Sequence, residues 1–152
     1  MKIYLASRFR TAATVRALAG KLREAGHIIT STWHDIEATP AGLVPYSDPG
    51  HEDHARLAAL RDIDQIQAAD VFVILTEDCE KTPGGLWFEM GVAYDKCMPC
   101  FVLGPKINIF CYLPQVKVFT EEAALLEELN FQARFLYRPS PPRPAAVAEV
   151  QQ

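Results

Sequence analysis

The chain has 152 residues, a net charge of −4 at pH 7 and a sequence pI near 5.5. This length suits one domain with its own core, and 49% apolar with 22% charged residues is an ordinary globular composition. The acidic balance argues against a nucleic-acid polymer as partner, because such polymers need a basic face. No apolar run approaches the roughly 20 residues that a membrane span requires.

Strand and helix patterns alternate along the chain. We expect strands over 2–6, 27–33, 71–76, 99–103 and 116–119, and helices over 11–25, 52–69, 85–96 and 121–136. Gly26 is the expected stop of the first helix. In the second helix, the apolar residues Leu57, Leu60, Ile63 and Ile66 are expected to face inward. The alternation predicts a single α/β domain, a parallel sheet flanked by helices.

Two segments fall outside this alternation. Residues 35–50 contain three prolines and form a long loop, a type of segment that often serves as a substrate lid. The proline-rich tail over 139–152 is expected to be disordered, which leaves 1–138 as the folded domain. The N-terminus has no signal-peptide layout, so we expect a cytoplasmic protein.

Metal-ligating residue types occur at two places. Cys97 and Cys100 have the spacing of half a zinc site, but no second pair follows, which favours reduced thiols. His51 and His54 lie beside two acids, yet histidines three apart at a helix start are usually surface residues. We therefore expect no metal.

The most informative stretch follows the apolar strand over 71–76. Gly84 and Gly85 allow a sharp turn, and the next helix carries Glu89 among Trp87, Phe88 and other apolar residues. This place, past the carboxyl end of a central strand, is where open α/β sheets hold ligands. Glu89 could act as a nucleophile or base. Alternatively, it complements the helix dipole near the N-terminus of that helix.

Three further acids, Asp62, Asp64 and Asp70, precede the same strand. Asp62 and Asp70 are eight residues apart, so a helix would place them on one stripe. The fold could bring Asp62 close to Glu89. A solvated acidic helix face is the alternative for each of the three.

Three sequence patterns together resemble a known family. They are Tyr4-Leu5-Ala6-Ser7 at the end of the first strand, Asp62 eight residues before Asp70, and Phe88-Glu89-Met90-Gly91 after the glycine turn. In order and spacing, over roughly residues 2–130, they resemble the nucleoside 2-deoxyribosyltransferases, including the branch of 2′-deoxynucleoside 5′-monophosphate N-glycosidases. The resemblance implies a Rossmann- or flavodoxin-like sheet. It implies Glu89 as nucleophile, Asp62 as the acid that assists departure of the base, and Tyr4 as the residue that orients Glu89.

The resemblance also bears on a 5′-phosphate. Arg10 matches an arginine of the monophosphate-hydrolysing branch, and with Ser7 and Arg8 at a helix start it forms a predicted phosphate cradle. Solvated helix-entry charges are the alternative for both arginines. Pro83 stands where the nucleoside-exchanging branch has an aspartate, six residues before the nucleophile. This departure weakens the match to that branch.

Three more residues are candidate substrate contacts. Gly85 lies in the glycine turn, and Trp33, at the end of the second strand beside His34, could stack on a base or pack in the core. Asn108 matches a segment that in the family often reaches a neighbouring subunit's pocket, although an apolar loop here could equally cover its own core. The family resemblance implies a homodimer or larger homo-oligomer.

Together with these residues, the family resemblance implies an enzyme that acts on a nucleoside or nucleotide without a cofactor. It would cleave the N-glycosidic bond of a 2′-deoxynucleoside or its 5′-monophosphate through a covalent deoxyribosyl-Glu89 intermediate. Water would resolve the intermediate by hydrolysis, or another base by transfer. The alternative is a non-catalytic nucleotide-binding sensor that uses the same pocket.

Overall fold

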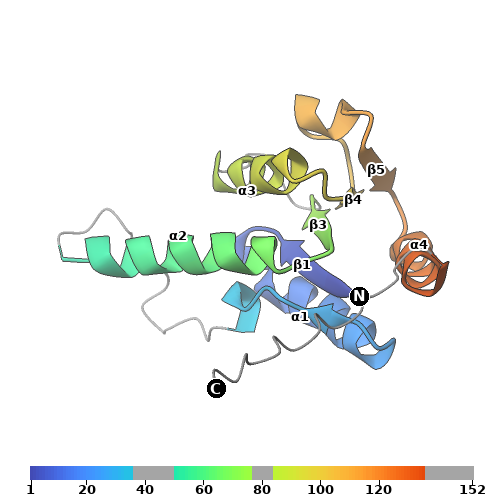
Figure 1. Cartoon of the computed structure of the whole chain (residues 1–152), viewed down its shortest axis with the longest axis horizontal. Helices are drawn as coiled ribbons and strands as arrows, with labels where there is room; N and C mark the ends of the chain where they lie inside the picture. Colours follow the sequence, from blue (N-terminus) through green and yellow to red (C-terminus); the bar gives the residue numbers. More distant parts are fainter. Residues whose placement is uncertain (36–49, 77–83, 136–152) are drawn as a thin grey trace, which may run out of the picture.

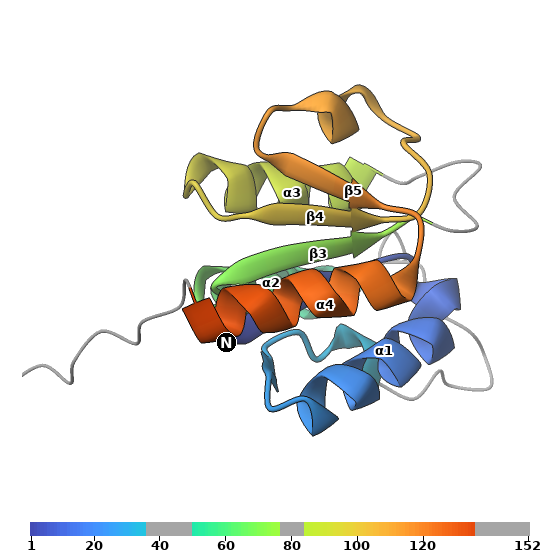
Figure 2. The ribbon, with the colours of Figure 1, turned by 90° about the vertical axis from the view of Figure 1, so that its right-hand side faces the viewer.

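The computed structural model describes residues 1–35, 50–76 and 84–135, and its centre is a five-stranded parallel sheet in the order β2-β1-β3-β4-β5 (Figures 1 and 2). The strands are β1 (Lys2–Ala6), β2 (Ile28–Ile29), β3 (Val71–Leu75), β4 (Cys100–Leu103) and β5 (Val116–Phe119). The helices are α1 (Ala12–Glu24), α2 (Glu52–Gln67), α3 (Gly84–Asp95) and α4 (Glu122–Phe135), with 3-10 turns η1 (Phe9–Thr11), η2 (Trp33–Asp35) and η3 (Ile109–Tyr112). The predicted parallel α/β fold is confirmed.

The strand order creates a switch point between β1 and β3. The chain passes from β1 outward to β2, and then crosses to the other side of β1 to form β3. β1 pairs in parallel with β2 (Ile3 opposite Ile29) and with β3 (Tyr4 opposite Phe72). In open α/β sheets the crevice for ligands lies at the carboxyl ends of the strands at this switch point.

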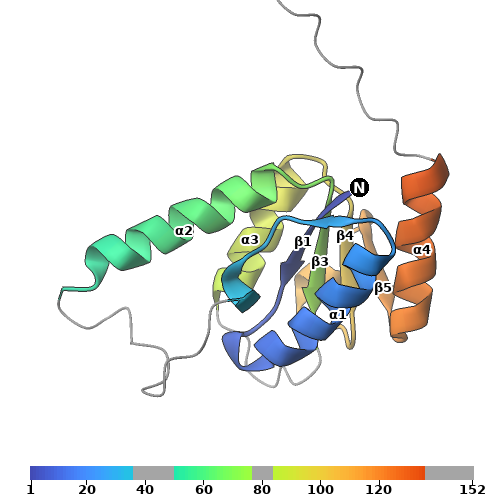
Figure 3. The same cartoon turned by 90° about the horizontal axis from the view of Figure 1, so that it is seen from below.

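Each face of the sheet has its own apolar core. On β1, Ile3 and Leu5 pack with α1 and α4, whereas Tyr4 and Ala6 pack with α2 and α3. Figure 3 shows the two helix pairs on opposite sides of the sheet. β3 is buried along its whole length, because it is central and covered on both faces. The alternation along β1 therefore aims Tyr4 at the α2–α3 side.

The second strand is shorter than predicted. The sequence pattern predicts a strand over 27–33, but β2 ends at Ile29. Beyond it, the side chains of Ser31 and Trp33, not a backbone ladder, meet the polar groups of Leu5 on β1. Trp33 itself belongs to the 3-10 turn η2.

Two of the four apolar residues of α2 that were predicted to face inward do not. Leu57 and Leu60 are 63% and 52% exposed, and within α2 only Ile66 is buried. The reason is visible in Figure 3, where α2 extends well beyond the sheet and only its C-terminal part lies against it. The spacing also predicts Asp70 on the same helix stripe as Asp62. However, α2 ends at Gln67, and the Asp70 carboxylate accepts a hydrogen bond from the Lys2 backbone.

Other boundaries agree closely with the sequence patterns. α1 ends just before Gly26, which has φ of +86° as expected for a helix stop. The predicted lid over 35–50 lies almost entirely outside the described residues, as does the proline-rich tail. Among the described residues, no helix has the length and apolar character needed to cross a membrane.

Candidate active site

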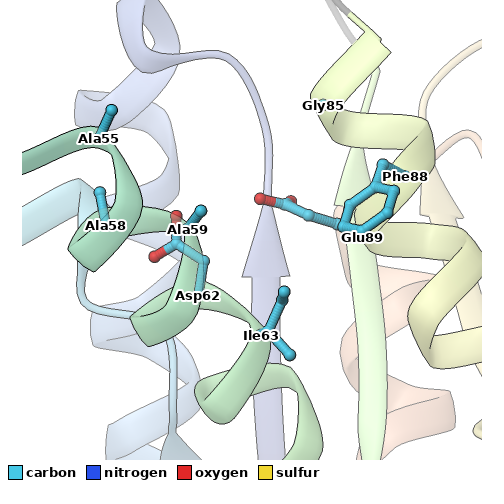
Figure 4. A pocket seen from close by; sticks show the side chains of 8 residues that line it. All are labelled: Ala55, Ala58, Ala59, Asp62, Ile63, Gly85, Phe88 and Glu89. Carbon is cyan, nitrogen blue, oxygen red and sulfur yellow. The ribbon is translucent and has the colours of Figure 1, made fainter. Parts of the chain in front are cut away.

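Two helices bring one carboxylate each to a shared cavity. α2 contributes Asp62 and α3 contributes Glu89 to a cavity of about 270 Å³. Its other lining residues are Ala55, Ala58, Ala59, Ile63, Gly85 and Phe88. Figure 4 shows the Glu89 side chain extending from α3 towards α2, where Asp62 lies. The predicted convergence of Glu89 and Asp62 is therefore present.

The pattern of α3 explains the direction of Glu89. Leu86, Met90 and Ala93 recur at helical spacing and are buried against the sheet. Glu89 lies on the flank of this stripe and is half-buried. Because it is beyond the first turn of α3, which contains no acid, complementing the helix dipole does not account for its place.

Tyr4, on β1, places its hydroxyl group next to Glu89. Its side chain is fully buried, and its ring stacks on Phe72 with 5.6 Å between the ring centroids. The Tyr4 hydroxyl donates a hydrogen bond to Glu89 Oε1 at a donor–acceptor distance of 3.5 Å. Burial raises the pKa of Tyr4 far above its usual range, and the charges of Glu89 and Asp62 raise it further. Tyr4 is therefore a donor at any working pH.

The surroundings of Glu89 make it a titrating group near neutrality. Burial raises the pKa of Glu89 to about 7, the negative charge of Asp62 adds to that rise, and the hydrogen bond from Tyr4 opposes it. A carboxyl group with a pKa near the working pH suits acid–base or nucleophilic chemistry.

Asp62 has a partner that the sequence analysis missed. Arg61 Nε and Nη2 lie 3.2 and 3.1 Å from Asp62 Oδ1. Burial raises the pKa of Asp62 above its ordinary value, while the Arg61 charge and hydrogen bonds lower it. Adjacent residues on a helix rarely face each other, so spacing alone gives no signal for this pair.

The sequence analysis also missed the alanines that line the cavity, although their spacing in the sequence could have indicated them. Ala55, Ala58, Ala59 and Asp62 follow the i, i+3, i+4, i+7 spacing of one helix face. Small side chains on this face leave room between α2 and α3. Gly85, predicted as a substrate contact, lines the opposite wall. Among the described residues, apart from its chain neighbours and the backbone of its own helix, no atom lies within 4 Å of a Cβ built there.

The predicted phosphate residues lie at the carboxyl edge of the sheet. The Ser7 hydroxyl donates to the Leu75 carbonyl (3.0 Å), so it bridges the ends of β1 and β3, and it lies 2.7 Å from Thr11 Oγ1. Arg8 precedes η1 and Arg10 lies within it. None of the three is among the residues that line the cavity of Glu89 and Asp62.

Trp33 and Asn108 are not brought to that cavity. The Trp33 indole N–H donates to the Leu5 carbonyl (2.7 Å), and the ring packs against both apolar cores. The Asn108 side chain accepts from the Phe110 backbone N–H (3.1 Å) and so begins η3. η3 adjoins a second cavity, of about 260 Å³, formed by Trp87, Met90, Gly91, Tyr94, Phe110 and Leu113.

The two cysteines with zinc-site spacing differ in exposure. Cys97 is exposed and Cys100 is buried. Within residues 1–35, 50–76 and 84–135, no three His, Cys, Asp or Glu side chains are grouped so as to hold a metal ion.

Solved structures share this fold. A conserved protein from Enterococcus faecalis V583 has a TM-score of 0.61 at 19% identity, over 87% of this chain and 98% of its own. The CMP N-glycosidase BcmB of Clostridium botulinum has a TM-score of 0.54 at 14% identity, over 86% and 99%. A 2-deoxyribosyltransferase from Bacillus psychrosaccharolyticus has a TM-score of 0.57 at 20% identity, over 83% and 90%. No family model and no curated protein matches the sequence.

The fold alone does not select an activity. The DNA processing protein A of Helicobacter pylori, described by its single-stranded DNA binding, shares it with a TM-score of 0.54 at 15% identity, over 85% of this chain and 80% of its own. The chain has the fold of the nucleoside 2-deoxyribosyltransferases, and the resemblance inferred from its sequence is confirmed at that level.

Proposed function

We propose that this protein cleaves the N-glycosidic bond of a 2′-deoxynucleoside or its 5′-monophosphate. The observation that carries the proposal is the set formed by Tyr4, Asp62 and Glu89. Two carboxyl groups from facing helices share one cavity, and a buried hydroxyl donates to Glu89. A pair of carboxyl groups is what glycosidic bond cleavage requires, one as nucleophile and one as acid.

In the first step a Glu89 oxygen attacks the anomeric carbon of the sugar. The bond from that carbon to the base breaks and its electron pair goes to the base nitrogen. The two carboxyl groups hold one proton between them, and in the reacting complex this proton lies on Asp62, which transfers it to the base while Glu89 is ionised. The product is a deoxyribosyl ester on Glu89. The transition state has oxocarbenium character, which the carboxylate stabilises.

The second step releases the sugar. Water attacks the same carbon after giving a proton to Asp62, and Glu89 leaves as a carboxylate, which completes hydrolysis. If the nitrogen of another base attacks instead, the product is a new nucleoside. Tyr4 supports both steps, because its hydrogen bond favours the ionised form of Glu89.

Ser7, Arg8 and Arg10 are proposed to bind a 5′-phosphate at the carboxyl edge of the sheet. Ser7 is held there by its bond to Leu75. Arg10→Gln tests this role. It should weaken turnover of deoxynucleoside monophosphates and leave that of unphosphorylated deoxynucleosides unchanged. An equal loss with both substrates would remove the phosphate role.

The activity test is chromatography of the protein incubated with each deoxynucleoside and each monophosphate, with and without an acceptor base. Glu89→Gln and Asp62→Asn should lose turnover, whereas Asp64→Asn, an exposed acid two residues from Asp62, should keep it. Release of base alone identifies a hydrolase, and a new nucleoside identifies a transferase. Absence of turnover together with ligand-induced thermal stabilisation would contradict the proposal and favour the sensor.

The homodimer or larger assembly implied by the family resemblance remains a prediction. Leu57 and Leu60 on α2 are exposed apolar residues that self-association could cover. Sedimentation equilibrium of the full chain tests it, and a monomer at micromolar concentration would contradict it.

A further inference from the structure

Within the part of the chain that the structure describes, no strand pairs with the carboxyl end of β1 on the β2 side, because β2 ends at Ile29. The last backbone bond of that ladder runs from the Thr30 N–H to the Ile3 carbonyl (2.8 Å). Leu5 faces the same side two residues later. Its N–H donates to Ser31 Oγ (3.1 Å), and its carbonyl accepts from the Trp33 indole (2.7 Å). Two side chains thus replace the missing strand.

A buried histidine extends this arrangement. Ser31 and His34 are both 0% exposed, and His34 Nε2 lies 3.3 Å from Ser31 Oγ. Ser31 Oγ accepts from Leu5, so its own hydroxyl hydrogen can go to Nε2 of a neutral ring. Asp35 Oδ1 lies 3.2 Å from the other ring nitrogen, Nδ1. The result is a chain of donors from the Leu5 amide through Ser31 to His34.

Ser31, His34 and Asp35 are the residue types of a nucleophilic triad. The burial of Ser31 argues against that chemistry, because no substrate reaches a serine that is 0% exposed and whose oxygen accepts a backbone hydrogen bond. Ser31 instead binds the backbone of Leu5, the residue that follows Tyr4 on β1, as Trp33 does.

We propose that Ser31, Trp33 and His34 are positioning residues that hold the carboxyl end of β1, and with it the Tyr4 hydroxyl, at Glu89. This inference rests on the proposed function. Tyr4 directly precedes Leu5, and its 3.5 Å contact with Glu89 is at the long limit of a hydrogen bond. A small displacement of β1 is therefore enough to break it.

The arrangement requires a neutral His34, because a charged ring would carry a hydrogen on Nε2 and could no longer accept from Ser31. The described charged groups around His34 are Asp35 in its own turn, and Arg16 and Arg23 on α1. Burial lowers the pKa of His34, and the Asp35 charge opposes that change. Burial thus favours the neutral form of His34.

Ser31→Ala removes the hydroxyl with little change of shape. Thr14→Ala, which removes an exposed hydroxyl on α1, is the matched control. We expect hydrogen exchange at the Leu5 amide to become about tenfold faster in Ser31→Ala, as for the loss of one hydrogen bond.

Because Tyr4 would then bind Glu89 less well, the Glu89 pKa measured by carbon NMR should rise. kcat should fall about tenfold or more with little change in KM. Trp33→Phe, which keeps a ring but loses the N–H, should act in the same direction.

The outcomes are distinguishable. Faster exchange at Leu5 with an unchanged Glu89 pKa and unchanged kcat would overturn the positioning role. A His34 tautomer with its hydrogen on Nε2, read by nitrogen NMR at neutral pH, would also overturn it. If the wild type turns over no substrate while Ser31→Ala still raises the Glu89 pKa, the positioning of Tyr4 stands and the proposed function fails.

Discussion

Glu89→Gln is expected to stabilise the fold while it abolishes turnover. A raised carboxyl pKa means that the folded state resists ionisation, so ionising Glu89 costs stability. The shift from 4.5 to about 7 corresponds to about 3 kcal/mol. The sign follows from proton linkage. Between these two values the folded protein binds more protons than the unfolded chain, so stability falls as pH rises through this window.

Glutamine keeps an oxygen for the Tyr4 hydroxyl but carries no charge. At pH 8 the variant should therefore exceed the wild type by up to about 3 kcal/mol, and at pH 4 the two should be equal. Urea unfolding at both pH values measures this difference. With a denaturant slope of about 2 kcal/mol/M, the midpoint at pH 8 should rise by about 1 to 1.5 M. Asp64→Asn, an exposed acid on α2, is the control and should show no comparable gain.

Equal stability of Glu89→Gln and the wild type at pH 8 would refute this reasoning, because it would mean that Glu89 is solvated when ionised. A loss of stability at both pH values would show instead that the variant disturbs packing. The expected pattern, a gain in stability with a loss of turnover, is typical of a residue retained for activity.

Four further predictions concern the same cavity. Tyr4→Phe keeps the stacking on Phe72 but removes the hydrogen bond that lowers the Glu89 pKa, so the acid limb of the kcat/KM profile should move to higher pH; an unmoved limb would contradict the role of Tyr4. Asp62→Asn should lower kcat about 10²- to 10⁴-fold for natural bases and much less for a substrate whose leaving group needs no proton; equal losses would argue against an acid. Arg61→Gln removes the group that lowers the Asp62 pKa, so the alkaline limb should move to higher pH, which a pH series of kcat/KM detects. Gly85→Ala should fold normally, because no other described element comes within 4 Å of the added Cβ, yet raise KM if substrate contacts this wall; an unchanged KM would remove Gly85 from the site.

The elements of the fold could be predicted because each has a local cause. The β-branched run of β3 and the glycine after α1 act through neighbouring residues, and the structure places both as expected. The extent of burial could not be predicted in the same way. Leu57 and Leu60 follow the apolar spacing of α2, but a pattern does not tell how far a helix extends beyond the sheet it packs on.

Some residues of the candidate site could likewise be predicted from the sequence, and others could not. Asp62 and Glu89 could be expected together, because the order of strands and helices brings their helices to one side of the switch point. The role of Trp33 in the fold could not be read from the sequence. An aromatic residue at a strand end suits base stacking and core packing equally, and only the folded structure shows that its N–H binds the Leu5 carbonyl. Arg61 was missed because its contact with Asp62 depends on side-chain rotamers.

The most direct test of the central claim is to look for sugar bound to Glu89. The protein is mixed with a deoxynucleoside or monophosphate that it turns over, quenched in acid within one turnover, digested, and analysed by peptide mass spectrometry. The account predicts a deoxyribosyl ester on the peptide that contains Glu89, which Asp64→Asn retains and Glu89→Gln lacks. Turnover without such an ester, or an ester on a different residue, would contradict the nucleophilic role of Glu89.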